Sequence, residues 1–315
     1  MDLSRANTEP MAGFVAFHNR FNRNIKVAVG GLDTLSQQVV ANPSDELPRG
    51  SEPWGRVTKG RNFQKEIEGS FTFISELGLA RTFSAFEDYL VGATAEFDRA
   101  QLAPIAAPPA NPTGFDRIAA MLGADGEEAE DIRAATKFFE IARNCVVHRS
   151  NRASSELIAL SASKPLKKAI ERWPGRQKIW RISLPEMRED AVVNWLPRHA
   201  ILASDAYYRA ACLLDRLLIQ KLGPDGMVQL ATHWCFFADE PVACPAKLNP
   251  ETMIRTQLVN RYKTVNPAIP EIVEIMKRSG KWTKVRDEFV RRAPTLGGKR
   301  NGPYQGVIAK PASTS

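Results

Sequence analysis

The stretch FFEIARNCVVHR, residues 138–149, decides how the rest of the chain folds. On an ideal helix its apolar side chains fall within an arc of about 120°. They are Phe138, Phe139, Ala142, Cys145 and Val146. The other arc carries Arg143 at one edge and His148 at the other, about 140° apart. We therefore expect these two side chains to line two sides of a cleft or to face a symmetry mate, and not to form one compact pair.

Apolar residues at helical spacing predict further helices on both sides of this stretch. They are expected at residues 63–96, 113–122, 127–148, 155–171, 199–222, 249–263 and 268–293. Thr113 is expected to cap the second of these helices, because Asp116 follows three residues later as in a capping box. Gly223 is expected to end the helix over 199–222. The fold class that follows is all-α.

Outside these helices the chain predicts less regular structure. Residues 1–62 are expected to be a short arm and linker, with a helix near Phe14–Phe21 and a strand near Ile25–Val29. A short strand or hairpin is expected between Trp173 and Pro197, and a loop-rich connection around Trp234–Phe237. The expected division is an arm and linker at 1–62, a helical bundle at 63–222, a basic helical extension at 223–293 and a disordered tail at 294–315.

The order R-N-C-V-V-H, from Arg143 to His148, resembles the R-x4–6-H signature of the HEPN superfamily. An apolar helix ending in FEDYL, residues 86–90, precedes it, as in many domains of that family. HEPN domains are helical bundles, and many are metal-independent endoribonucleases of toxin–antitoxin, abortive-infection and CRISPR-linked defence systems. The resemblance implies a HEPN-like bundle over about half the chain and a homodimer whose two motifs share one composite active site. It also implies a role in toxin–antitoxin or antiviral defence, with an antitoxin or defence protein as partner.

The polar residues of the motif suit RNA cleavage. RNA carries its own nucleophile, the ribose 2′-OH, so the enzyme needs a proton acceptor or donor near neutral pH and a cation at the phosphate. His148 fits the first need, and Arg143 fits the second. Asn144 can orient the imidazole or bind a phosphate oxygen. No metal or cofactor is expected, because the sequence has no acidic cluster of the two-metal type and no common nucleotide-binding motif.

Other interpretations stay open. Arg143 could form a salt bridge with Glu140 on the same helix, and His148 could be an exposed helix cap. Some HEPN domains have lost activity, so the alternative function is a non-catalytic RNA- or nucleotide-binding scaffold. His233, Cys235 and Cys244 are zinc-ligand types, but they lack paired spacing, and packing is the favoured explanation.

The charge of the chain is concentrated at its C-terminal end. Residues 251–315 hold 13 Lys and Arg against 5 Asp and Glu, a balance of +8 that equals the net charge of the whole chain. A basic segment favours a polyanionic partner such as RNA. The expected RNA contacts are Arg149, Lys277, Arg278, Lys281 and Lys284. The competing interpretation is a helix that packs through Ile272, Ile275, Met276, Val285 and Phe289, with its charges merely solvated.

The composition of the chain indicates the cellular compartment in which we expect it. The chain has 43% hydrophobic and 25% charged residues, which is typical of a globular protein. Its four cysteines have no framework spacing, and no apolar run approaches membrane-spanning length. We expect a reduced, cytoplasmic protein with no membrane association.

Overall fold

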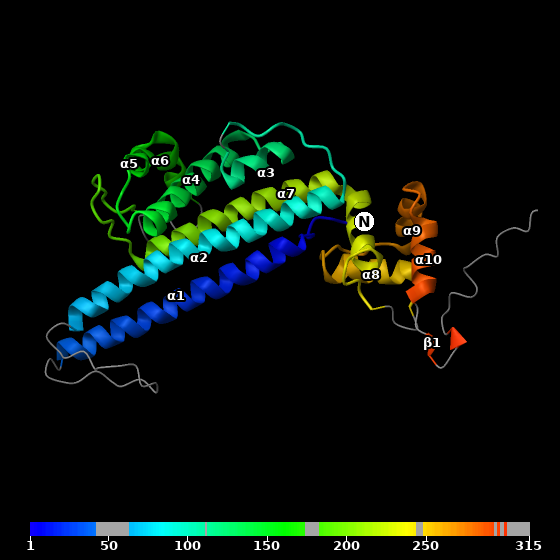
Figure 1. The fold of residues 1–315 in the computed structure, drawn as a ribbon, viewed down its shortest axis with the longest axis horizontal. Helices are drawn as coiled ribbons and strands as arrows, with labels where there is room; N and C mark the ends of the chain where they lie inside the picture. The colour runs from blue at the N-terminus through cyan, green and yellow to red at the C-terminus, as the bar shows by residue number, and fades with distance from the viewer. Residues whose placement is uncertain are drawn as a thin grey trace, which may run out of the picture. The chain divides into compact units, whose positions relative to one another are not determined.

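The structure is a computed structural model, and it describes residues 1–41, 63–110, 112–173, 183–243 and 248–292 together with the backbone of 295–296 and 299–300. It is predominantly helical, which confirms the all-α class (Figure 1). The helices are α1 Glu9–Ala41, α2 Phe63–Arg99, α3 Gly114–Leu122, α4 Gly126–His148, α5 Ser155–Ala162, α6 Lys164–Glu171, α7 Pro197–Phe236, α8 Pro250–Asn260, α9 Ile269–Arg278 and α10 Trp282–Arg292. Two short strands, β1 Thr295–Leu296 and β2 Lys299–Arg300, pair antiparallel.

The chain forms two compact units, each assembled from separated stretches. The first unit contains residues 1–12, 91–105 and 215–315, and the second contains residues 13–90 and 106–214. Helices α1, α2 and α7 contribute residues to both units. The motif residues of α4 all belong to the second unit.

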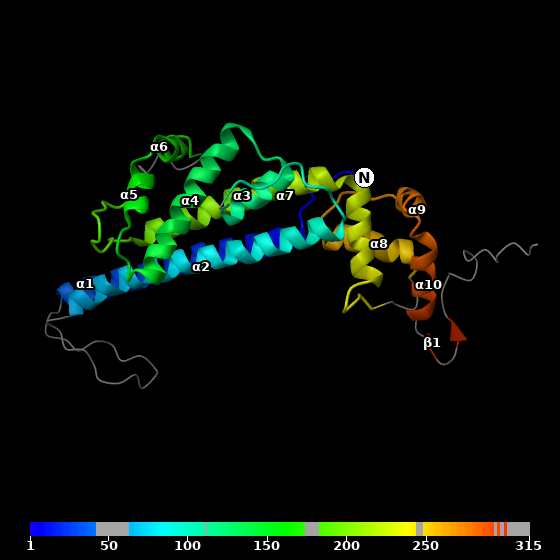
Figure 2. The ribbon, with the colours of Figure 1, turned by 45° about the horizontal axis from the view of Figure 1, so that its top comes forward.

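The N-terminal expectation of a short helix followed by a strand is wrong. Residues Glu9–Ala41 form one helix, α1, which runs beside α2 in both views (Figures 1 and 2). Phe14 and Ile25 are buried on its inner side, whereas Val27 is 70% exposed. Val27 is one of the β-branched residues that suggested a strand. It lies on the solvent side of α1, where packing does not restrict which residue is used.

Several boundaries follow the expectation and others do not. Thr113 caps α3: its side chain accepts a hydrogen bond from the Asp116 backbone N–H at 3.1 Å. The helix expected at 199–222 ends at Gly223, whose φ of 56° and ψ of −171° are not helical. A second helical segment of α7 begins directly at Pro224 and continues through the region that was expected to be loop-rich. Proline suits the first turn of a helix, where its missing N–H would have no partner, so α7 consists of two segments joined by a kink.

Two of the expected helices are each divided in the structure. Ser163 ends α5 and caps α6, with its side chain accepting from the Leu166 backbone N–H. Gly280, with φ 67°, separates α9 from α10. The hairpin residues at 174–182, the linker at 42–62 and most of the expected C-terminal tail lie outside the described residues.

The core of the second unit is aromatic where α1, α2 and α7 meet. Phe86 stacks on Tyr207 at 4.9 Å between ring centroids, and Phe14 lies 5.8 Å from Tyr89. The Tyr89 hydroxyl donates to the Ala211 carbonyl at 3.0 Å. A Cβ at Gly78 would lie 2.7 Å from the Ala200 Cβ, so glycine allows α2 to approach α7 closely. Helices α5 and α6 flank α4.

The C-terminal helices of the first unit pack through their apolar faces. This confirms the competing interpretation of their apolar residues, because all five are buried: Ile272, Ile275, Met276, Val285 and Phe289. Thr232 of α7 donates to the Met276 sulfur at 3.2 Å. Arg292 donates to the carbonyls of Cys235 and Val242, at 2.7 and 2.6 Å, and so holds α10 against the end of α7.

Glu96 and Asp215 carry two of the carboxyl groups that are buried in the first unit. The Asp215 carboxylate accepts hydrogen bonds from the hydroxyl and backbone N–H of Thr8. The Glu96 side chain accepts a long hydrogen bond from the Tyr262 hydroxyl, 3.4 Å, and its other oxygen has no partner among the described residues. Burial, and then the neighbouring Asp215, raise the pKa of Glu96 from 4.5 to about 8. A carboxyl group buried in this way is held protonated near neutral pH.

The pH dependence of stability should reveal Glu96. Because its folded-state pKa lies above its ordinary value, its contribution to stability is complete below about pH 4.5 and is lost as the pH rises through about 8. Glu96→Gln keeps the shape without the ionisation. We expect the difference in unfolding free energy, Glu96→Gln minus wild type, to increase by a few kcal/mol between pH 5 and pH 8.5. Denaturant titrations at the two pH values measure this. Glu66→Gln, at an exposed position of the same helix, should track wild type. If the unfolding free energies of wild type and Glu96→Gln changed with pH in parallel, the prediction for Glu96 would be contradicted.

Candidate functional site

Helix α4 turns its apolar face inward as the sequence predicts. Phe138, Phe139, Ala142 and Cys145 are all buried, and Val146 is half-buried. The Phe138 ring packs edge-on to Trp195. The polar arc is left toward the surface: Arg143 and Asn144 are half-buried, and His148, the last residue of the helix, is exposed.

Arg143 and His148 lie against each other within one chain. The Arg143 Nη1 is 3.4 Å from the His148 Nε2, and it donates to the Asn144 Oδ1 at 3.0 Å. The expectation that the two side chains cannot form one compact pair is therefore wrong. Five residues rise only about 7.5 Å along a helix axis, and the long arginine side chain spans this distance and the angular separation together. The helical wheel gave the direction of each Cβ but ignored the reach of the guanidinium.

Phe83 of α2 supports the guanidinium from one side. The Arg143 Cζ lies 4.9 Å from the centroid of that ring, within the range of a cation–π contact. The Arg143 Nε is buried and has no hydrogen-bond partner among the described residues. An unpartnered buried donor costs about 1–3 kcal/mol. Arg143 is therefore held by its contact with the Phe83 ring and by two polar contacts of Nη1. Its Nε donor makes no hydrogen bond with a described residue.

Acidic groups lie one turn before Arg143. Burial, then the charges of Glu87 and Asp116, raise the pKa of Glu140 above its ordinary value. Among the described residues Arg143 has no ion pair with Glu140; its hydrogen bonds are with Asn144 and His148. The salt-bridge alternative for Arg143 is thus not what the structure contains.

Asn151, which the sequence analysis did not single out, anchors the end of α4. It is 4% exposed and adopts a left-handed conformation with φ 63°. Its side-chain N–H groups donate to the Glu76 carboxylate at 2.5 Å and the Val193 carbonyl at 2.8 Å, and its Oδ1 accepts from the Trp195 indole at 2.8 Å. Its backbone N–H donates to the Cys145 carbonyl at 3.0 Å. The available signal was the preference of asparagine for left-handed positions after a helix, but its partners are distant in sequence.

Arg149 lies directly after the motif helix and is exposed. Its guanidinium forms an ion pair with Asp190 at 2.6 Å, and Arg152 donates to the Asp190 carbonyl. Exposed ion pairs contribute roughly 0–1 kcal/mol, so this contact leaves Arg149 able to exchange Asp190 for another anion.

The expected RNA contacts of the C-terminal helices divide into two groups. Arg278 forms a bidentate contact with Asp225 at 2.6 and 2.7 Å, and Lys281 donates to Gln229 at 3.2 Å. Lys277 and Lys284 are exposed. Arg278 and Lys281 thus join α9 and the residue before α10 to the second segment of α7, whereas Lys277 and Lys284 remain available to a ligand. All four belong to the first unit.

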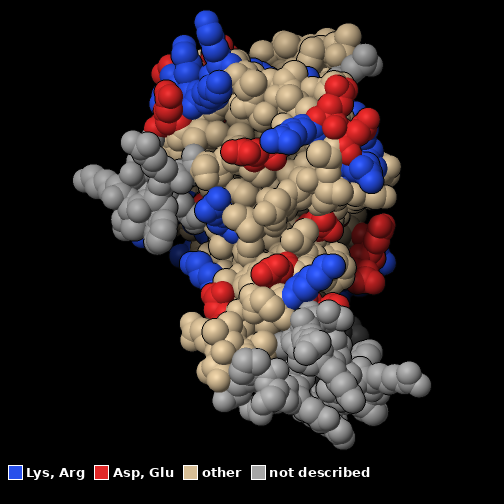
Figure 3. Space-filling model, turned by 90° about the vertical axis from the view of Figure 1, so that its left-hand side faces the viewer, with Lys and Arg blue, Asp and Glu red and all other residues tan. Residues whose placement is uncertain are grey.

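The described residues contain no group of three or more His, Cys, Asp and Glu side chains that could hold a metal ion. Of the zinc-ligand types, Cys235 is buried and forms no disulfide with another described residue, and Cys244 lies outside the described residues. Nor is any helix of the described ranges both long and apolar enough to cross a membrane. The face shown in Figure 3 carries basic and acidic side chains interspersed over uncharged surface, with no field of a single sign.

Substitution of Asn151 should weaken the chain measurably. Asn151→Ala leaves the Trp195 indole N–H and the Val193 carbonyl without their side-chain partner and forces alanine into a left-handed conformation. We expect the unfolding free energy to fall by about 2–4 kcal/mol, measured by urea titration. Asn151→Gly removes the same hydrogen bonds but tolerates the backbone, so it should lose about 1 kcal/mol less. Ser150→Ala, at the exposed left-handed neighbour, should stay within about 0.5 kcal/mol of wild type. Equal losses for all three variants would refute the anchoring role.

Comparisons with known proteins found no match for the chain. No protein-family model, no curated protein and no solved structure matches it. The function is therefore inferred from the side chains at the end of α4 and from the chemistry that they can support.

Proposed function

We propose that this protein is a HEPN-like, metal-independent endoribonuclease whose catalytic residues are Arg143, His148 and Asn144. The observation that carries the proposal is the contact between the Arg143 guanidinium and the His148 imidazole, 3.4 Å apart at the exposed end of α4. One side chain transfers protons near neutral pH, and the other binds phosphate oxygens with a planar fork. These are the two functions that cleavage by the ribose 2′-OH requires.

The first step is activation of the nucleophile. In the tautomer that carries its proton on Nδ1, the His148 Nε2 accepts from the Arg143 Nη1, which can only donate. A contact of 3.4 Å is long for such a bond. When Arg143 turns to a phosphate oxygen, the Nε2 lone pair is free to take the 2′-OH proton. The 2′ oxygen then forms a bond to phosphorus, and the bond from phosphorus to the 5′ oxygen breaks. The products are a 2′,3′-cyclic phosphate and, after protonation, a 5′-OH.

Arg143 stabilises the charge that develops during this step. The phosphorane carries more negative charge on its non-bridging oxygens than the substrate does, so a guanidinium lowers the barrier more than it tightens ground-state binding. The unused Nε donor of Arg143 supports this role. Asn144, which accepts from Arg143 Nη1 at 3.0 Å, holds the guanidinium near the imidazole until a phosphate replaces that contact.

The leaving 5′ oxygen needs a proton while His148 has just received one. A second copy of the motif in the same cleft would supply a protonated imidazole as the general acid. This need for a second imidazole supports a homodimer with a composite active site. The angular separation of Arg143 and His148 on the helix is no longer an argument for that assembly. The resemblance to HEPN domains supports the same assembly.

The wider role is proposed from that resemblance. It places the enzyme in toxin–antitoxin or antiviral defence, with an antitoxin or defence protein as partner and the cytoplasm as its compartment. Within the first unit, Lys277 and Lys284 would contact RNA phosphates, and Arg278 and Lys281 would add to their charge while forming internal contacts. Arg149, in the second unit, is proposed as a separate phosphate contact beside the motif.

Substitutions at the motif test the catalytic assignment. His148→Ala should lower kcat for single-stranded RNA cleavage by about 10²–10⁴-fold, and Arg143→Ala by about 10²–10³-fold. The products of wild type should carry a 2′,3′-cyclic phosphate, and cleavage should persist in EDTA. Because both side chains lie off the buried face of α4, the urea midpoint of each variant should stay close to that of wild type.

Two comparison variants sharpen that test. Lys137→Ala, a cation on the same helix, should retain wild-type kcat. Lys277→Glu/Lys284→Glu should raise KM and leave kcat unchanged, which separates affinity from chemistry. Full cleavage by His148→Ala would remove the catalytic assignment. RNA binding by wild type without cleavage under any condition would favour the scaffold alternative.

Mixed dimers test the composite site. His148→Ala and wild-type chains are co-refolded at equal concentration, and cleavage is compared with that of wild type alone at the same total protein. If both imidazoles act in one cleft, only dimers of two wild-type chains are active, and activity falls to about a quarter; independent sites would leave about half. Sedimentation velocity confirms that the mixture is dimeric. A monomeric, fully active wild type would defeat the shared cleft.

A further inference from the structure

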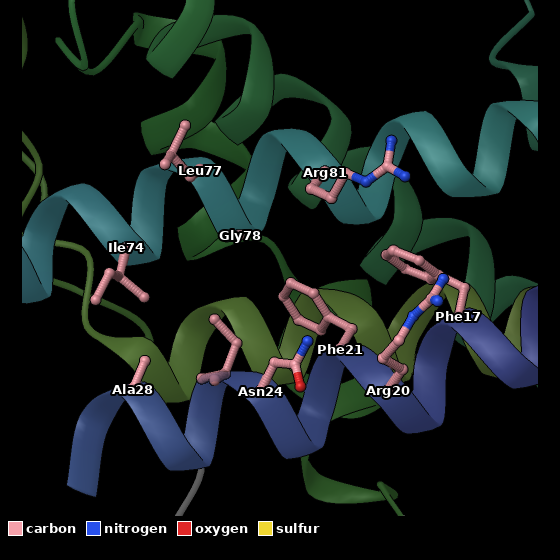
Figure 4. Close-up of a pocket in the computed structure, with 10 residues that line it drawn as sticks. Phe17, Arg20, Phe21, Asn24, Ala28, Ile74, Leu77, Gly78 and Arg81 are labelled. Carbon is pink, nitrogen blue, oxygen red and sulfur yellow. The ribbon is translucent and has the colours of Figure 1, made fainter. Parts of the chain in front are cut away.

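A groove of about 480 Å³ runs between α1 and α2 in the second unit, remote in sequence from the motif (Figure 4). Its walls are mostly apolar, and two arginines stand at its rim. The lining residues are Phe17, Arg20, Phe21, Asn24, Ile25, Ala28, Ile74, Leu77, Gly78 and Arg81. In the close-up, Phe21 points from α1 toward α2, and Leu77 lies on the side of α2 that is farther from α1 in this view.

The packing of the three helices builds this groove. A Cβ at Gly78 would lie 2.7 Å from Ala200 Cβ and 3.3 Å from the Phe21 ring, so α2 sits close to both neighbours at this point. Phe17 and Phe21 stack at 5.6 Å between centroids and form an ordered wall. On the α2 side Leu77 is 53% exposed, and Phe73, one turn earlier, is 60% exposed. Adjacent large apolar side chains left to water mark a binding surface more often than chance exposure.

The charge at the rim has one sign. Arg20 and Arg81 are exposed, and the lining contains no Asp or Glu. The Arg81 Cζ lies 5.6 Å from the Phe17 ring centroid, so its stem covers the apolar wall while its charge stays at the edge. Neither guanidinium forms an ion pair with any described residue. Two uncompensated cations beside an apolar trough attract a ligand that brings both carboxylates and apolar side chains.

We propose that this groove docks an amphipathic segment of a partner protein, with two apolar anchors about one helical turn apart and Asp or Glu residues beside them. A second copy of the chain is a poorer occupant, because a twofold interface would bring the like-charged arginines of both copies into one contact. Single-stranded RNA is a poorer occupant, because Ile25, Ile74 and Leu77 line the groove beside its two phenylalanines and only two cations are present to contact phosphates. The proposal does not depend on catalysis, since it concerns binding alone.

Peptide selection on the full chain tests this surface without a known partner. Random peptides of about 16 residues, a length that spans such a groove as a helix, are selected against immobilised protein and then measured by fluorescence anisotropy. We expect an enriched group with apolar residues at i and i+3 or i+4 and flanking acids. Its affinity should fall at least ~10-fold on Arg20→Glu/Arg81→Glu and also on Leu77→Asp. His148→Ala should bind it normally, which separates this test from that of the ribonuclease.

A control variant and a charge-reversed peptide test whether the charge of the rim decides binding. Arg23→Glu/Lys26→Glu changes two exposed cations of the same helix that line a different hollow, and it should bind the peptides like wild type. A peptide with Lys in place of its acids should prefer Arg20→Glu/Arg81→Glu over wild type. The proposal is overturned if the selected peptides lack acidic residues, if they bind the two double variants equally, or if oligouridine displaces them. A dimer that Arg20→Glu/Arg81→Glu converts to monomer would assign the groove to a second copy instead.

Discussion

The hydrogen bond from the Trp195 indole to the Asn151 side chain fixes the position of the C-terminal end of α4, which carries the candidate site. Both residues are almost fully buried, and each lies in a connection, not in a helix. The same asparagine side chain contacts α2 through Glu76, and its backbone contacts the last turn of α4 through Cys145. Because a buried amide with all its partners tolerates little displacement, the last turn of α4 and the residues that follow it are held in one arrangement. That arrangement fixes the positions of Arg143 and His148.

The parts of the fold that the sequence predicted are those set by local periodicity. Apolar spacing located α2, α3 and α4, and the Thr113 cap placed the start of α3. Where local signals compete with packing, the prediction failed. Val27 looks like part of a strand, but in α1 it faces solvent at 70% exposure, so its β-branched side chain has no part in deciding the structure. Gly223 does end the first segment of α7, but the prediction missed the second segment, which begins at once at Pro224 where a loop was expected.

The sequence supplies the residues of the candidate site but not their geometry. Residue types and their spacing along the chain single out Arg143, Asn144 and His148 as candidates, and their catalytic role stays a prediction. Their contact could not be derived from a helical wheel, because it depends on side-chain length and on Phe83, which supports the guanidinium from another helix. Asn151 was missed for a related reason: its partners Glu76 and Trp195 lie 75 and 44 residues away along the chain. Contacts of this kind appear only once the helices are packed.

The support beneath Arg143 bears on how a substrate would enter. The Phe83 ring contacts the guanidinium through its π face, which stabilises a cation but accepts no conventional hydrogen bond and imposes no single rotation on it. The contact with His148 Nε2 is long, and Asn144 engages one nitrogen only. A phosphate can therefore exchange with both contacts while the ring continues to support the cation. Turning the guanidinium would expose the buried Nε donor and free the imidazole in the same movement. Substrate binding and activation of His148 would then be one event.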